Sequence, residues 1–319
     1  MKYRRITIYV WITALSFLLV SCIKDDFSKK LNDEKKVLAN YIDTTYPGTQ
    51  PSQSGLYYVQ KIPGYGATPT YDNMVIFSYQ GKTLEGNIFD TSDSTEASAN
   101  KIISFSSVDG PLKISLRSFY SPGVIEGILN MREGETALLA MPYHLGFNSY
   151  SDFTPVLFNV TLLKVITDPR QFEFEQMGKY LKTLNDTLEL SDSTKTDITG
   201  IYMVIDSTNR APGVGFPNDY QTVTVNYSAA LIPYEDDYFL SVPLRSIQSK
   251  EGFKVILGVD NVIKGFEGAI RRMKKGDSAK VVFPYYRGYG TAPVPNSSNQ
   301  LVIPEYSTLV YDIEVTNIQ

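Results

Sequence analysis

The sequence predicts an α+β protein built from two copies of one domain, each a curved antiparallel β-sheet wrapped around a short α-helix. The main observation is an internal repeat at a constant offset of 142 residues. Strand-like runs also outnumber helical ones, and the second half contains one short amphipathic segment with helical spacing. The repeated landmarks are Gly123, Met131, Gly134, Pro142 and Phe147 in the first copy and Gly265, Met273, Gly276, Pro284 and Tyr289 in the second.

The first 21 residues have the pattern of a secretion signal. Basic residues precede an apolar run over residues 6–20, which is too short to span a bilayer comfortably. The run ends in Leu19-Val20-Ser21-Cys22, which resembles a bacterial lipobox, the signal in which the cysteine becomes the lipidated first residue. We therefore expect residues 1–21 to be removed and Cys22 to hold the chain on a membrane of a bacterial cell envelope. The outer membrane, facing the periplasm or the surface, is the expected location. An ordinary signal peptide with a chance cysteine is the alternative.

Composition excludes several classes of function. The chain has 30 basic and 34 acidic side chains, so its net charge is −4, and loss of the basic signal makes the mature chain more acidic. A nucleic-acid partner is not expected, because such proteins carry a basic face. With a single cysteine, the chain has no intramolecular disulfide and no thiolate metal site. No metal or other cofactor is expected.

The predicted segments follow one another along the chain. Residues 22–53 are expected to form a tether with a short helix near 33–41, before a first copy over 54–166. Residues 167–198 are expected to form a helical linker, because apolar residues between 170 and 184 have helical spacing. The second copy covers 199–319. Both helices are interpreted as packing or spacer elements.

Local patterns within the copies agree with the fold class. Residues 74–79 and 222–227 are rich in β-branched and aromatic residues, which is typical of strands. Phe266, Ile270 and Met273 fall at positions i, i+4 and i+7, so they share one face of a short helix. Gly276 stands where a helix C-cap belongs. Residues 279–283 and 309–315 alternate as half-buried strands do.

One stretch carries a recognisable combination of motifs. The helix pattern over 262–277 is followed by Pro284, then by Gly288-Tyr289-Gly290, and finally by the strand pattern over 303–315. Together these segments resemble the second half of an FKBP-type peptidyl-prolyl isomerase domain. The resemblance covers about residues 54–166 and 199–319. It implies a pocket that holds one proline ring, proline-containing polypeptides as partners, and catalysis without a cofactor.

The resemblance also implies roles for residues of the second copy. Phe266 stands where the family usually has the tryptophan that floors the pocket. The Tyr289 hydroxyl would reach the substrate carbonyl, and the backbone N–H of Ile263 would donate a second hydrogen bond. In one departure, Phe239-Leu240 replaces the Phe-Asp pair of the family, so the pocket carboxylate is missing. The apolar walls correspond to Tyr227, Phe239, Phe253, Val262, Ile303 and Tyr311.

The first copy departs from the family in its other half. Tyr79-Gln80-Gly81 and Phe89-Asp90 match the front-half motif at its usual spacing, and Phe158 matches the last aromatic wall. The constant offset pairs Val124 with Phe266, and a valine floor stacks poorly on proline. Phe147 lacks the hydroxyl that Tyr289 has. We expect the first copy to be inactive or weak and the second to be the isomerase.

The residues leave other interpretations open. Phe266, Phe253, Val262 and Tyr311 would be apolar in any core with these periodicities, so core packing explains each of them singly. At the level of function, a membrane-anchored isomerase that assists folding of envelope or secreted proteins competes with a binding or chaperone lipoprotein whose two pockets are catalytically weak. A third possibility, a surface receptor for glycan or another nutrient, is supported only by the expected location.

Overall fold

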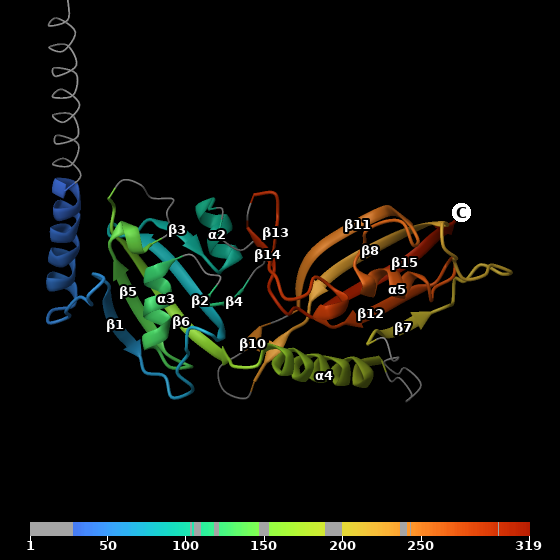
Figure 1. Cartoon of the computed structure of the whole chain (residues 1–319), viewed down its shortest axis with the longest axis horizontal. Helices are drawn as coiled ribbons and strands as arrows, with labels where there is room; N and C mark the ends of the chain where they lie inside the picture. The colour runs from blue at the N-terminus through green and yellow to red at the C-terminus, as the bar shows by residue number, and fades with distance from the viewer. Residues whose placement is uncertain are drawn as a thin grey trace, which may run out of the picture.

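The structure is a computed structural model, shown in Figure 1. The predicted signal over 1–21, Cys22, Phe147 and Phe239 lie outside the residues that it describes. The described residues are 28–102, 104, 110–117, 121–146, 153–188, 200–236, 241–242, 244–298 and 300–319.

The first copy is an antiparallel sheet of six strands that curves around one helix. The strand order is β1-β5-β6-β2-β3, and β4 pairs with β2. A helix, α3 (Pro122–Asn130), lies on the concave face (Figure 1). The strands are β1 (Tyr57–Ile62), β2 (Met74–Thr83), β3 (Ile88–Thr91), β4 (Leu112–Ser115), β5 (Thr136–Met141) and β6 (Val156–Ile166); the remaining elements are α2 (Ser94–Asn100) and the 3₁₀ turn η1 (Tyr143–Leu145).

The second copy repeats this arrangement with a sheet of order β11-β8-β15-β12-β7 around α5 (Lys264–Ile270). All of its strand pairs are antiparallel. The strands are β7 (Tyr202–Asp206), β8 (Thr222–Leu231), β11 (Arg245–Ile256), β12 (Ser278–Phe283) and β15 (Leu309–Ile318), and η2 (Tyr285–Arg287) follows β12. Two small ribbons complete the copy: β9 (Tyr234–Glu235) with β10 (Ser241–Val242), and β13 (Val294–Pro295) with β14 (Leu301–Ile303).

The two sheets have the same topology. Strands β1, β5, β6, β2 and β4 correspond in order to β7, β12, β15, β8 and β11. The predicted α+β fold and its duplication are therefore confirmed. The offset of 142 holds through β5 and β12, and through the two 3₁₀ turns that follow them.

Close packing of the helix on the sheet explains the repeated glycines. A Cβ atom at Gly123 would lie 2.6 Å from the sulfur of Met141, and one at Gly265 would lie 2.5 Å from the ring of Phe283. Met141 and Phe283 are themselves 142 residues apart. Only glycine allows the helix to approach these large side chains, so the same contact recurs in both copies.

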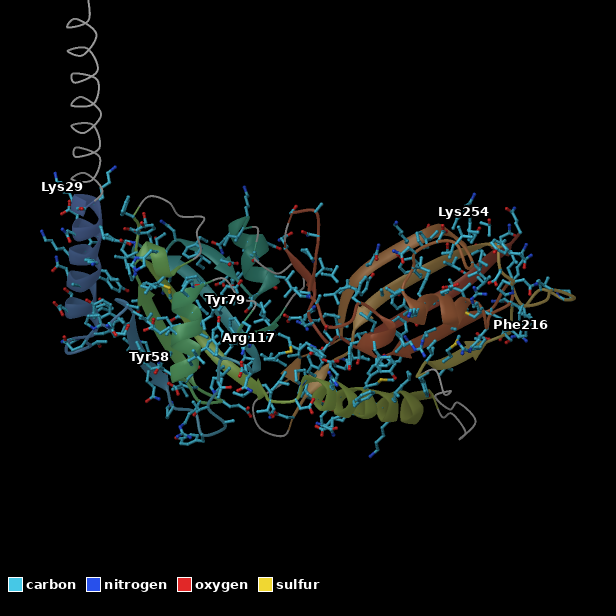
Figure 2. All side chains as sticks on the ribbon, in the orientation of Figure 1. Lys29, Tyr58, Tyr79, Arg117, Phe216 and Lys254 are labelled. Carbon is cyan, nitrogen blue, oxygen red and sulfur yellow. The ribbon has the colours of Figure 1, made fainter. Side chains whose placement is uncertain are left out.

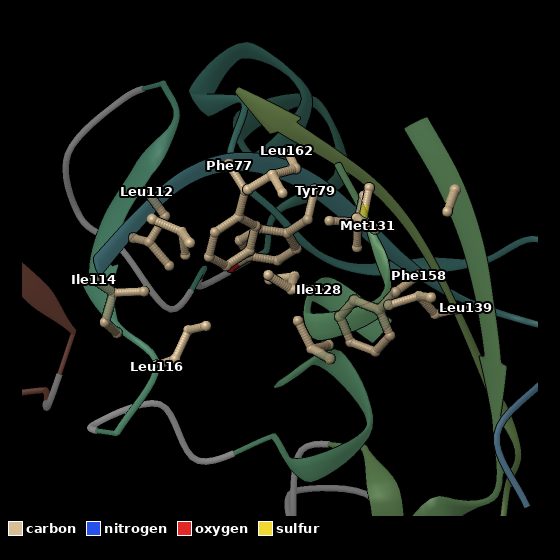
Figure 3. Close-up of a cluster of buried hydrophobic side chains, with 14 of the residues drawn as sticks. Phe77, Tyr79, Leu112, Ile114, Leu116, Ile128, Met131, Leu139, Phe158 and Leu162 are labelled. Atoms are coloured by element: carbon tan, nitrogen blue, oxygen red, sulfur yellow. The ribbon is translucent and has the colours of Figure 1, made fainter. Parts of the chain in front are cut away.

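Each copy has its own hydrophobic core between helix and sheet. In the first copy Val124 and Ile128 of α3 are buried against Phe77, Tyr79 and Phe158 of the sheet (Figure 3). In the second copy the core includes Phe266, Ala269 and Ile270 of α5, together with Tyr227 and Tyr311.

The helix that precedes each copy in the sequence packs on the outer face of that copy's sheet. In the helix over residues 28–45, Leu38 and Ile42 are buried with Ala140 of β5. In α4 (Pro169–Leu188), Phe172 and Met177 are buried with Val282 of β12, the equivalent of Ala140. The repeated unit therefore includes a preceding helix, which sequence reasoning had interpreted as tether and linker. No helix in the described ranges has both the length and the apolar character that crossing a membrane requires.

The copies also share a core. Met74, Ile76 and Ile166 of the first copy belong to the same buried cluster as α4 and as Tyr234 of the second. Successive residues of β2 thus point to different cores, since Val75 and Phe77 face α3. Because this shared cluster is apolar and buried, the copies are packed against each other through their own side chains.

Candidate functional site

A small cavity opens between α5 and the concave face of the second sheet. Its volume is about 170 Å³. Pockets for drug-sized ligands are about 300–1,000 Å³, so this cavity suits a single ring rather than a large molecule. It is lined by Tyr227, Gln248, Phe253, Asn261, Val262, Ile263, Phe266, Tyr289 and Tyr311.

Three kinds of local structure bring these side chains together. Alternation along β8 and β15 turns Tyr227 and Tyr311 toward the helix. Ile263 is the N-cap of α5, so Phe266 projects from the first turn of the helix. Gly290 has a φ of +80°, which glycine adopts without strain, and its N–H donates to the carbonyl of Tyr285. This tight turn after η2 presents Tyr289 at the rim.

The floor of the cavity is a cluster of aromatic rings. The Phe266 ring lies 5.1 Å from the ring of Tyr227 and 5.3 Å from that of Tyr311, both between centroids. Phe253 adds an edge-to-face contact with Tyr227 at 5.6 Å. Phe266 is only 3% exposed, so its ring is fixed by its neighbours, and it lines the cavity.

Few polar groups face this apolar floor. The hydroxyl of Tyr289 is hydrogen-bonded to that of Tyr311, and Tyr289 remains 39% exposed at the rim. Burial, with a smaller contribution from Tyr289, raises the pKa of Tyr311 above its ordinary value. Burial likewise raises the pKa of Tyr227. Both phenols are therefore neutral at physiological pH and act only as hydrogen-bonding groups.

Ile263, at the start of α5, also lines the cavity and carries a backbone donor. The N–H of Ile263 makes no hydrogen bond to any residue that the structure describes. Residues at a helix start commonly leave such donors for a side chain, water or ligand. The cavity thus combines an aromatic floor, the partly exposed phenol of Tyr289, the side-chain amides of Gln248 and Asn261, and the backbone of Ile263.

Most residues predicted for this site meet around the cavity. Ile303 is absent from this lining; its side chain is buried in the apolar core of the second copy. Phe239 lies outside the described residues. Sequence reasoning missed Gln248 and Asn261; adjacency to Val262 was the only signal for Asn261, and Gln248 sits at a register shift of β11. The predicted residues that meet are Tyr227, Phe253, Val262, Ile263, Phe266, Tyr289 and Tyr311.

The corresponding region of the first copy is closely packed. Tyr79 lies 6.2 Å from Phe158 between ring centroids, and Phe89 makes an edge contact with Phe158 at 5.6 Å. Tyr79 and Phe158 are buried, at 5% and 0% exposure. Figure 3 shows both rings among the core side chains of the first copy, and Figure 2 labels Tyr79 within that copy. Asp90 is buried on β3, and Val124 is buried where the second copy has Phe266. Phe147 lies outside the described residues.

Comparison with known proteins identifies matching families and relatives. The family described as FKBP-type peptidyl-prolyl cis-trans isomerase matches residues 66–163 and 213–316. The matched ranges fall one in each copy and together cover more than half of the chain.

Individual relatives align with this chain over lengths comparable to one copy. The chain is 34% identical over 130 residues to the isomerase FkpA of Escherichia coli K12, which covers 39% of this chain and 40% of that protein. It is 30% identical over 114 residues to FK506-binding protein 1 of Saccharomyces cerevisiae, covering 36% of this chain and 90% of that protein. The crystal structure of the three FKBP domains of wheat FKBP73 aligns with a TM-score of 0.31 and 17% identity, over 84% of this chain and 96% of that chain.

Proposed function

Because the chain belongs to the FKBP-type peptidyl-prolyl cis-trans isomerase family, we propose that it isomerises peptide bonds before proline, in the cavity of the second copy. The chain spans only 40% of the length of FkpA, so the activity of the whole protein is our proposal. The observation that carries it is the convergence of Phe266, Tyr289 and Ile263 on one cavity of about 170 Å³.

The chemistry needs only an environment that favours a twisted amide. Rotation about the bond before proline crosses a barrier of about 18–20 kcal/mol and takes tens to hundreds of seconds. Resonance keeps the amide planar and separates charge, which water stabilises. A dry aromatic cavity withdraws this stabilisation, so it binds the twisted and less polar amide better than the planar one.

Each group at the cavity has a distinct part in this proposal. The prolyl ring would lie on Phe266, within the aromatic cluster formed with Tyr227 and Tyr311. The Tyr289 hydroxyl, on binding, would exchange its partner Tyr311 for a substrate carbonyl. The Ile263 N–H would donate the second hydrogen bond. No proton is transferred, which agrees with the neutral phenols.

An assay of prolyl isomerisation tests this proposal. The purified chain should accelerate isomerisation of a proline-containing peptide, and Tyr289→Ala should weaken the acceleration. Because Tyr289 is partly exposed, this change leaves the core intact. Asp90→Asn in the first copy serves as a control and should leave the rate unchanged. Absence of acceleration by the unaltered chain would refute the proposal.

For location, we propose a lipid anchor at Cys22 in a bacterial cell envelope, at the outer membrane, with envelope or secreted proteins as clients. Support comes from the basic start, the apolar run over 6–20 and the Leu19–Cys22 motif. Multiple acyl chains give stable attachment, whereas a single chain binds reversibly. Cys22→Ala should move the expressed protein from the membrane fraction to the soluble one.

A binding or chaperone role without catalysis is the second candidate. The observation that favours it is Phe239-Leu240, which stands where the family has Phe-Asp, so a pocket carboxylate is missing. Under this alternative the purified chain would suppress aggregation of a client protein that contains no slow prolyl bond. It would do so without any isomerase activity.

A further inference from the structure

The second copy contains an insertion that the first copy lacks. Equivalent residues are 142 positions apart at Tyr143 and Tyr285, but 153 apart at Phe153 and Tyr306. The equivalence is structural, because each pair packs its rings together, at 4.7 Å for Tyr143 with Phe153 and 5.1 Å for Tyr285 with Tyr306. The second copy therefore has about 11 more residues here, and they form the hairpin β13–β14.

The hairpin reaches from the second copy into the first (Figure 1). Leu301 is 5% exposed and belongs to the hydrophobic cluster of the first copy, with Leu112, Ile114 and Leu116 of that copy. Gln300 donates from its side-chain amide to the backbone carbonyl of Ser104 at 2.7 Å. An apolar contact from Leu301 and a hydrogen bond from the residue before it thus hold the hairpin on the first copy.

The hairpin tip is organised to present Gln300. The backbone N–H of Asn296 donates to the carbonyl of Gln300 at 2.9 Å, and the Asn296 amide donates to the Gln300 side-chain oxygen at 2.9 Å. With its oxygen held in this way, the Gln300 amide nitrogen points toward Ser104.

The segment after the hairpin continues the contact. The backbone N–H of Ser115 donates to the carboxylate of Glu305 at 3.3 Å, and Lys113 donates to the carbonyl of Tyr306 at 3.4 Å. Glu305 is 3% exposed. Ser115 and Lys113 both lie on β4, so that strand forms much of the docking surface for residues 300–306.

The same segment is bonded to the loop that carries Tyr289. The N–H of Tyr306 donates to the carbonyl of Gly290 at 3.1 Å. Ile303 and Val294 pack in the core of the second copy. A continuous path of contacts therefore joins the first copy to Tyr289 through residues 290–306.

We propose that the first copy, whose own pocket is eroded, acts as an internal docking partner for hairpin β13–β14. Docking holds the Tyr289 loop over the cavity of the second copy. Leu301 and Gln300 are then positioning residues for isomerisation, although neither touches the cavity. This inference rests on the proposed isomerase function.

Two full-chain variants test the docking. Leu301→Asp places a charge in the apolar cluster, and Gln300→Ala removes the hydrogen bond while leaving the cores intact. Ser297→Ala, exposed on the same hairpin, is the matched control. Amide hydrogen exchange over residues 288–308 and the isomerisation kinetics are measured for each, together with the unfolding midpoint to verify folding.

Both test variants should speed exchange over 288–308. Leu301→Asp should lower kcat/KM by about tenfold, since displacing a group by about 1 Å costs up to about 100-fold. Gln300→Ala should lower it less, and Ser297→Ala should change neither measurement. Unchanged exchange in both variants overturns the docking, and faster exchange with unchanged kinetics overturns the positioning role. Inactivity of the unaltered chain instead overturns the proposed function, while the exchange data still decide whether the hairpin docks.

Discussion

The ammonium of Lys113, on β4 of the first copy, is hydrogen-bonded to the carboxylate of Glu173 in α4, and both side chains are 2% exposed. Burial lowers the pKa of Lys113, and the neighbouring Glu173 opposes this shift. The same carboxylate accepts from the Tyr234 hydroxyl at 2.9 Å and from the Thr308 N–H at 3.0 Å. Glu173 therefore joins three separate strand regions at the interface between the copies.

Glu173→Gln is expected to destabilise the chain by about 3 kcal/mol or more. The change leaves the Lys113 ammonium buried without its counter-charge, which typically costs about 3–5 kcal/mol. Lys113→Met should lower the free energy of unfolding by less, because Tyr234 and Thr308 still donate hydrogen bonds to the Glu173 carboxylate. Urea unfolding at neutral pH measures both. Asp312→Asn, which breaks the exposed pair with Lys280, is the control and should change stability by about 1 kcal/mol at most. If Glu173→Gln changed stability as little as the control Asp312→Asn, this account would be contradicted.

Phe266→Leu is expected to lower kcat/KM by roughly fivefold while the chain stays folded. Leucine retains much of the volume but loses the flat face, and aromatic contacts contribute about 0.5–1.5 kcal/mol beyond their buried area. Isomerisation kinetics on a proline-containing peptide measure the effect. Val124→Ala, at the equivalent position of the first copy, should reduce stability but not the rate per folded molecule. A rate unaffected by Phe266→Leu would speak against the aromatic floor.

Gly265→Ala and Gly178→Ala should shift stability in opposite directions. Both glycines lie in helices, but a Cβ at Gly265 would lie 2.5 Å from the Phe283 ring, whereas one at Gly178 meets nothing within 4 Å. Overpacking should destabilise Gly265→Ala by about 1–3 kcal/mol. Gly178→Ala should stabilise by up to about 1 kcal/mol through helix propensity. Thermal or urea unfolding distinguishes the two, and a stabilised Gly265→Ala variant would refute the close approach of α5 to β12.

Asp277 should make part of the stability depend on acid pH. Burial alone would raise the pKa of Asp277, but hydrogen bonds from the Arg210 guanidinium and the Lys274 N–H outweigh it and hold the pKa below its ordinary value. A depressed carboxyl pKa stabilises the folded state above the unfolded pKa of about 3.9, and this contribution disappears as the pH falls through the lower folded-state pKa.

Urea unfolding between about pH 5 and pH 2.5 tests this sign. Near pH 5, Asp277→Asn should be less stable than the unaltered chain. This difference in the free energy of unfolding should narrow as the pH falls. Asp312→Asn is a suitable control, because that carboxylate is exposed and pairs with Lys280 at the surface. A difference that stays constant or grows as the pH falls would contradict the depressed pKa.

Predictions from sequence succeeded where a pattern is local. Phe266 and Ile270 at helical spacing indicated the short helix, and the constant offset in the sequence indicated its counterpart in the first copy. The predicted end was wrong, because α5 stops at Ile270 with Arg271 as its C-cap, and Met273 and Gly276 lie beyond it. Helices were also expected near 33–41 and over 170–184, and the structure has them at 28–45 and 169–188. Their packing on the outer faces of the sheets was not expected, because an apolar stripe does not specify what covers it.

Ile303 illustrates why the candidate site was only partly predictable. Its match to a wall position placed it at the cavity, but β14 pairs with β13 and turns its side chain into the core. Gln248 was missed for a related reason, since the register shift in β11 decides which face it occupies. Strand pairing and register, which a hydrophobic pattern does not specify, decide both positions.

The sequence by itself determined the duplicated α+β fold, the short helices and the aromatic set of the second copy, because these follow from spacings within a few residues or from a constant offset. Only the tertiary structure decided that hairpin β13–β14 rests on the first copy and that Lys113, Glu173 and Glu305 meet between the copies. Those contacts join residues more than 50 positions apart, and their stability comes from burial and hydrogen bonds that exist only once both copies are packed together.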